Sequence, residues 1–203
     1  MNPRVVRRFI VLMALLTVGG FIFWDVLDDF VKRAPGDFET EMGSNRLVDE
    51  QYDEAMDYFD KALLEAPDHR GALMGRALVF IRTERYDEAI AELDYLIDFL
   101  NRNLTEVDDT GRGVLAAAHA NRGIVHDRQE RYEEALADYI QALNTDNETV
   151  GGPGVIDKIL YGSEGVSSVR DRAIYIHEQL QLPEGERLMR VPELDAKQRM
   201  YKP

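Results

Sequence analysis

The stretch YDEAMDYFDKALLEAP at residues 52–67 recurs twice further along the chain. The second copy is YDEAIAELDYLIDFLN at residues 86–101, 34 residues later, and the third is YEEALADYIQALNTDN at residues 132–147, after a step of 46 residues. The longer step equals one 34-residue period plus 12 residues. Self-similarity at a fixed period of roughly 20 to 50 residues is typical of proteins built from stacked repeats. We therefore expect a repeat array.

Each copy has the residue pattern of an amphipathic helix. A tyrosine is followed by paired acids in the first turn, where the positive end of the helix dipole favours them, and then by apolar residues at helical spacing. The pattern predicts second helices at 52–65, 86–103 and 132–144, preceded by first helices at 37–49, 70–82 and 113–129. A pair of helices cannot bury such faces alone, so stacked pairs share them. The predicted fold class is all-α.

These residues resemble the tetratricopeptide repeat (TPR), in three copies over residues 36–147. The small residue that the family needs for close helix approach is present as Gly43, Ala77 and Gly123. The leucine that usually precedes it is replaced by Met42, Arg76 and Arg122. The resemblance implies a TPR-type α-solenoid of antiparallel helix pairs.

The amino-terminal part of the chain has the pattern of a membrane anchor. Residues 1–8 are basic, and Phe9–Trp24 contains sixteen residues without a charge. We expect a transmembrane helix at residues 9–27, with the amino terminus in the cytoplasm because arginines precede the span and acids follow it. In a bacterium this places the protein in the inner membrane, with the repeats in the periplasm. The alternative is a signal peptide cleaved after Gly20.

Charge and composition exclude several classes of function. The net charge is −14, and because residues 1–24 carry three arginines and no acid, the remainder has a net charge of −17. So acidic a surface repels phosphate groups, and we expect no nucleic-acid binding. The sequence contains no cysteine, which excludes disulfides and thiolate chemistry.

The sequence presents no catalytic constellation, cofactor motif or metal site, so we expect no enzyme, no cofactor and no small-molecule substrate. His119 and His126 are seven residues apart, which separates them by about 10 Å along a helix. One metal ion cannot easily bind both, and we interpret them as helix-packing residues. The acid pairs of the second helices are explained by the helix dipole.

The resemblance implies that the first helices line a concave wall that binds protein. The predicted binding residues are Thr40, Ser44, Leu47, Met74, Leu78, Ile81, Arg82, Ala120, Ile124, Asp127 and Arg128. A wall that is apolar at its centre suits an apolar peptide or an amphipathic helix. Family members that hold a terminal carboxylate use lysine and asparagine at set positions, where only Asn121 fits here, so we do not expect that activity. Alternatively, the last helix or the tail of the same chain covers the wall.

After Asn147 the pattern changes. Helices are expected at 155–161 and 166–181, which would form a degenerate capping pair at residues 150–182. Residues 183–203 contain prolines and many charges and are predicted to be an extended tail, which could cross the repeats, bind a partner or be disordered.

The sequence thus predicts a membrane-anchored TPR adaptor that scaffolds or assembles a membrane or periplasmic complex. The alternative is a stoichiometric accessory subunit of a large membrane enzyme, in contact with its other subunits. The two differ in stoichiometry after detergent extraction.

Overall fold

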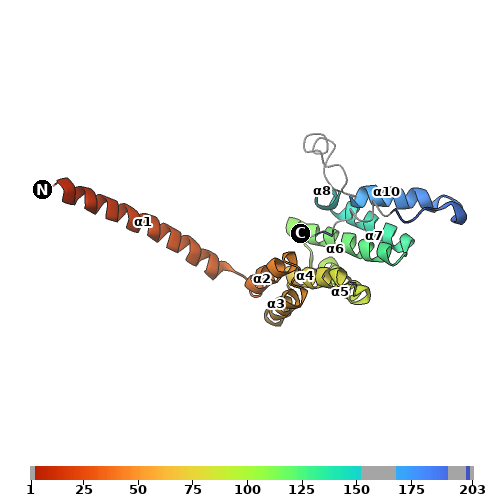
Figure 1. Cartoon of the computed structure of the whole chain (residues 1–203), viewed down its shortest axis with the longest axis horizontal. Coiled ribbons are helices and arrows are strands. Elements are labelled where there is room, and N and C mark those ends of the chain that lie inside the picture. The colour runs from red at the N-terminus through yellow and green to blue at the C-terminus, as the bar shows by residue number, and fades with distance from the viewer. Residues whose placement is uncertain (1–2, 152–167, 192–199, 202–203) are drawn as a thin grey trace.

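The computed structural model describes residues 3–151, 168–191 and 200–201 of the 203-residue chain, and every regular element in these ranges is helical. The elements are α1 (Pro3–Lys32), α2 (Asp37–Val48), α3 (Tyr52–Glu65), α4 (Arg70–Arg82), α5 (Tyr86–Asn103), α6 (Asp109–Arg128), α7 (Tyr132–Thr145), α8 (Asn147–Val150), α10 (Val169–Leu180) and the 3-10 helix η1 (Glu184–Glu186). In Figure 1 the repeat helices stack together, and α1 extends away from them at one end. The all-α class is confirmed.

The repeat helices begin and end close to the predicted residues. Helices α3 and α5 match the predictions, and α7 ends one residue later than expected. The start of α6 was predicted too late, because the carboxylate of Asp108 accepts a hydrogen bond from the N–H of Gly111 at 2.7 Å and caps an additional turn. The extra 12 residues therefore lengthen α5 and α6, and only Leu104–Asp108 lies between them.

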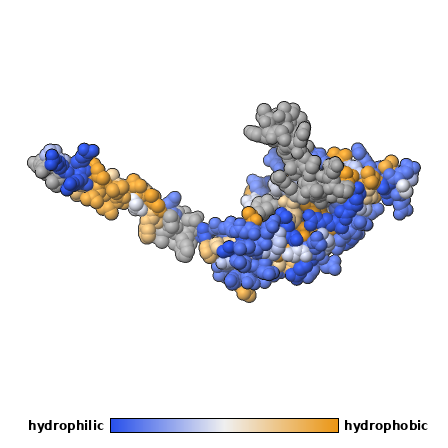
Figure 2. Space-filling model, in the orientation of Figure 1, coloured by the Kyte–Doolittle hydropathy of each residue, from blue (hydrophilic) through white to orange (hydrophobic). Residues whose placement is uncertain are grey.

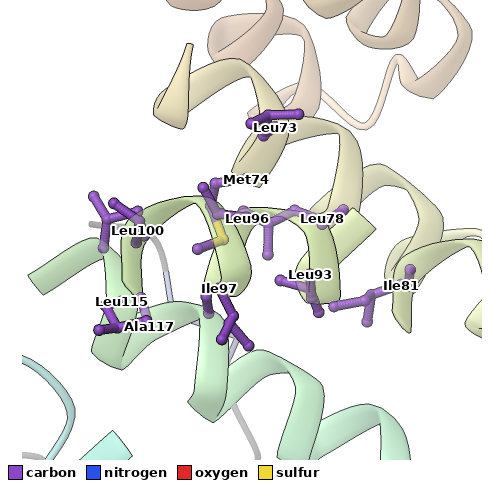
Figure 3. Close-up of a cluster of buried hydrophobic side chains, with 14 of the residues drawn as sticks. Leu73, Met74, Leu78, Ile81, Leu93, Leu96, Ile97, Leu100, Leu115 and Ala117 are labelled. Atoms are coloured by element: carbon purple, nitrogen blue, oxygen red, sulfur yellow. The ribbon is translucent and has the colours of Figure 1, made fainter. Parts of the chain in front are cut away.

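Successive helix pairs share their apolar faces instead of forming separate cores. Figure 3 shows one cluster made by α4, α5 and α6, which includes Leu73, Leu96 and Leu115. A second cluster joins α6, α7 and α10, and Ile124 and Tyr139 belong to it. Each fully buried side chain of this size contributes about 1.5–3 kcal/mol. Because α6 belongs to both clusters, it connects the repeats to the region that follows them.

Glycines allow aromatic rings of the second helices to approach the first helices. A Cβ atom added to Gly43 would lie 2.7 Å from Cε1 of Phe59, and one added to Gly123 would lie 2.7 Å from Cδ1 of Tyr139. Both rings are fully buried. The small residues of the repeat motif are therefore required by the rings that pack on them.

Arginines that replace the usual leucine bridge neighbouring second helices. Arg76 in α4 donates hydrogen bonds to Glu92 of α5 at 2.7 Å and to Asp60 of α3 at 2.9 Å. One repeat later, Arg122 in α6 makes the corresponding contacts. Its partners are Asp138 of α7 at 2.6 Å and Asp94 of α5 at 2.5 Å. The two arginines that depart from the family pattern therefore form a repeated ion-pair arrangement.

The region after the repeats packs on their end through α10. Arg172 of α10 forms two hydrogen bonds of 2.7 Å with the carboxylate of Asp127 in α6. The helix predicted at 166–181 is found as α10, whereas the helix predicted at 155–161 lies outside the described residues. The capping pair at 150–182 therefore stays a prediction, of which α10 supplies the second helix.

Helix α1 contains the one segment within the described residues that is long and apolar enough to cross a membrane, Val6–Asp25. At about 1.5 Å per residue its length is about 30 Å, the thickness of a hydrocarbon core. No part of it is buried against the rest of the chain. Figure 2 shows its apolar surface next to a hydrophilic amino end. By length and composition, this segment has the features of a membrane anchor and equally those of a signal sequence.

The turn between the two helices of each repeat contains a glutamate in the left-handed conformation. Glu50, Glu84 and Glu130 have φ values of 60°, 58° and 63°. The residue after each of them donates back to the helix, as when the N–H of Arg85 donates to the carbonyl oxygen of Phe80 at 2.8 Å. Glycine is usual at this position after a helix, because a Cβ atom costs about 1–2 kcal/mol there.

Replacing Glu84 by glycine should therefore raise the free energy of unfolding by about 1 kcal/mol. The measurement is urea unfolding of the full chain in detergent micelles, followed by far-ultraviolet circular dichroism. Glu84→Ala keeps the Cβ atom and is the matched control, for which we expect no comparable gain. Equal stabilities of the glycine and alanine variants would contradict the interpretation.

Candidate protein-binding surface

A pocket of about 160 Å³ opens on the wall formed by the first helices α2 and α4. It is lined by Thr40, Ser44, Leu47, Gly71, Met74, Gly75 and Leu78. Five of these residues are predicted binding residues, and they come from two different repeats. The lining is mostly apolar with two hydroxyl groups, which is the composition that accepts an apolar side chain and fixes its orientation.

The other predicted residues occupy different depths in the wall. Arg82 is exposed at the end of α4, and the half-buried Arg128 donates a hydrogen bond to the carbonyl oxygen of Ile81 at 3.5 Å. Ile81, Ala120 and Ile124 are at most 1% exposed. These three side chains are buried behind the surface of the wall. Of the five residues in this paragraph, only Arg82 and Arg128 are therefore accessible to a partner.

Asp127 lies within the protein and not on an accessible surface. It is 2% exposed, and its carboxylate is paired with Arg172, which is 4% exposed. The hydroxyl group of Tyr139 donates a third hydrogen bond to it at 3.2 Å. The sequence-based expectation that Asp127 faces a partner is not met in this conformation, because α10 covers the carboxylate.

Asn121 is a wall residue that was not among the predicted binding residues. It is fully buried, and its side-chain amide forms two hydrogen bonds with the main chain of Tyr201. Its position in the repeat motif was the available signal, because the family resemblance places it where members that hold a terminal carboxylate use asparagine. The contact with Tyr201 had no signal in the sequence, since 80 residues separate the two.

Two histidines and an arginine surround the buried carboxylate of Asp138 at the contact of α6 and α7. Nδ1 of His119 lies 3.2 Å from Oδ1 of Asp138, and Nε2 of His126 lies 3.6 Å from Oδ2. Burial raises the pKa of Asp138, but the hydrogen bonds from His119 and Arg122 outweigh it and leave the pKa below its usual range. Burial lowers the pKa of His126. The histidines thus lie between helices, as a packing role requires.

Comparison with known proteins identifies the repeats. Residues 40–102 match a family model described as tetratricopeptide repeat, and residues 116–149 match a second model with the same description. Among solved structures, the chain is similar to one described as the first TPR of Spaghetti (RPAP3) bound to the HSP90 peptide SRMEEVD. The identity is 18%, the TM-score is 0.53, and the match covers 73% of this chain and 94% of that chain. No curated protein sequence matches the chain.

The lowered pKa of His126 predicts that stability falls in mild acid. The unfolded chain takes up a proton on this histidine at its ordinary pKa of about 6.5, whereas the folded chain does so only at lower pH. The unfolded state therefore binds more protons, and the free energy of unfolding should decrease as the pH falls below about 6.5. His126→Gln should flatten this dependence in urea unfolding measured between about pH 7.5 and about pH 5.

His177→Gln is the control for this measurement, because His177 is exposed on α10 and its replacement also removes one imidazole. The control variant should keep the slope of the unmodified chain. An unchanged slope in His126→Gln would show that the buried histidine does not cause the acid sensitivity.

Proposed function

Because this chain belongs to the tetratricopeptide-repeat family through residues 40–102 and 116–149, we propose that it is a membrane-anchored adaptor that binds a protein partner on its concave wall. Stacked helical repeats create extended concave surfaces, and proteins of this architecture use them for binding. The adaptor holds together or assembles a membrane or periplasmic complex and carries out no chemical reaction.

The observation that carries this proposal is the open pocket between α2 and α4. It combines residues from two successive repeats, as a surface that binds along the stack requires. Its apolar lining and the adaptable side chain of Met74 favour insertion of an apolar side chain from a peptide or an amphipathic helix. The similar solved structure is described with a bound peptide, which supports a peptide as the kind of partner.

The exposed helix α1 supports membrane anchoring. Arg4, Arg7 and Arg8 precede the uncharged stretch Phe9–Trp24, and Asp25 follows it. The positive-inside bias then favours a cytoplasmic amino terminus and repeats on the opposite side, which is the periplasm in a bacterium. An anchor confines the adaptor to the membrane surface and so raises its effective concentration near membrane partners.

The accessory-subunit alternative has support from the same helix. Beyond the neighbouring residues and backbone of α1 itself, Gly19 and Gly20 have no heavy atom within 4 Å of the position that a Cβ atom would take. Small residues allow transmembrane helices to pack closely, so α1 could lie against helices of a larger enzyme. A permanent subunit remains in a fixed ratio to that enzyme after detergent extraction, whereas an assembly factor does not.

Anchoring and orientation can be tested on native membranes. We expect the full-length chain to stay in the membrane pellet after alkaline carbonate extraction, because α1 spans the bilayer. Protease added outside spheroplasts should digest the repeats, since they lie on the outer side. Release of a shortened chain into the soluble fraction would instead identify a cleaved signal peptide, and protection from protease would reverse the orientation.

Ser44→Arg should block the pocket, because it places a long charged side chain among apolar residues. We expect cross-linking mass spectrometry on native membranes to recover partner peptides at least about tenfold less than for the unmodified chain. Gln141→Arg on the exposed face of α7 adds the same charge and is the matched control. Equal recovery from both variants, with unchanged thermal unfolding, would exclude the pocket as the binding site.

A further inference from the structure

The part of the wall formed by α6 is occupied by the chain's own residues Met200 and Tyr201. Nδ2 of Asn121 donates a hydrogen bond to the carbonyl oxygen of Tyr201 at 2.7 Å, and the N–H of Tyr201 donates to Oδ1 of Asn121 at 2.8 Å. One side-chain amide thus pairs with both main-chain groups of one residue, as a neighbouring β-strand would. Because Asn121 is fully buried, water competes poorly for these bonds.

The side chains of these two residues make the remaining contacts of a docked peptide. Tyr201 packs against both apolar clusters, and Met200 packs against the cluster of α4, α5 and α6. The hydroxyl oxygen of Tyr201 accepts a hydrogen bond from the N–H of Val169 at the start of α10, at 3.1 Å. Burial also raises the pKa of this hydroxyl group. Main chain and side chain are therefore both recognised.

Two features suit this segment to displacement. Met200 and Tyr201 are only half-buried, so part of each side chain is accessible from outside the helices. In addition, the hydrogen bonds between Asn121 and Tyr201 involve only main-chain groups of Tyr201, and every extended peptide presents such groups. Another extended segment can therefore make the same two hydrogen bonds without any change in the helices.

We propose that Met200–Tyr201 is an intramolecular ligand that occupies this half of the wall until an extended segment of a partner displaces it. The proposal rests on the function proposed above, because it concerns the same wall. A displacing segment pairs its main chain with Asn121 and places an aromatic residue with a hydroxyl group next to the N–H of Val169. Because the internal ligand is tethered, it competes at a high effective concentration and lowers the apparent affinity of the partner.

The test uses a fluorescent peptide of residues 197–203 (KQRMYKP) as the probe. The probe is titrated against the full chain in detergent and against the chain ending at Asp195. We expect the shortened chain to bind the probe at least about tenfold more tightly, because its site is empty. Asn121→Leu in the shortened chain should abolish binding, and a probe with Tyr201→Ala should bind weakly. Equal affinity for both chains, or binding that does not depend on Asn121, would overturn the proposal.

Two further measurements decide the remaining cases. If the shortened chain loses cooperative thermal unfolding, Met200–Tyr201 is part of the folded core, and the displacement proposal is wrong. A photo-reactive phenylalanine analogue at position 201 of the full chain should cross-link within one chain, and an excess of unlabelled probe should reduce the yield. Cross-linked dimers would assign the segment to a second copy and overturn the intramolecular arrangement.

None of these outcomes depends on the capture of a partner at the pocket between α2 and α4, so the proposed function is tested separately.

Discussion

The structure depends on the fact that no helix pair of this chain can bury its apolar face alone. The faces of α4 and α5 are completed by α6, and those of α6 and α7 are completed by α10. This sharing fixes the register of each pair against the next. It also places the first helices on the same side of the stack, so that Thr40 and Ser44 of one repeat reach Met74 and Leu78 of the next. The wall is therefore a consequence of how the core is built.

Ion pairs specify the same stacking at two positions where an arginine replaces the usual leucine. Arg76 and Arg122 stand where leucine would pack, and each joins the second helices of two successive repeats. Exposed pairs contribute about 0–1 kcal/mol, whereas breaking a buried one costs more. Glu92 and Asp138 are the buried members, at 9% and 4% exposure, so they would be left without a counter-charge by any other register. The first repeat has Met42 at this position and lacks the arrangement.

The sequence predicts what is periodic and misses what occurs once. The second helices were placed within a residue because tyrosine, acids and alanine recur at fixed spacing, and the glycines that accept Phe59 and Tyr139 follow the same period. The arginine bridges were also readable in principle, since Arg76 and Arg122 each precede their buried acid by 16 residues. The pairing of Arg172 with Asp127 occurs once and spans 45 residues, and without a repeated pattern to mark it, Asp127 looked like a surface residue.

The two halves of the wall meet at Met74, and this contact gives the proposed displacement a physical consequence. Sδ of Met74 accepts a hydrogen bond from Nδ2 of Asn121 at 3.4 Å, while the same side chain lines the open pocket. Nδ2 also holds the carbonyl oxygen of Tyr201, so removal of Tyr201 frees a donor beside a flexible thioether. On the proposed displacement, a partner segment that replaces Tyr201 gives Nδ2 of Asn121 a new carbonyl acceptor, so Met74 keeps its position. A partner that enters only the pocket between α2 and α4 leaves Tyr201 bound and meets Met74 in its present position. On the proposed function, Tyr201 therefore influences the open pocket through Met74 as well as the part of the wall formed by α6.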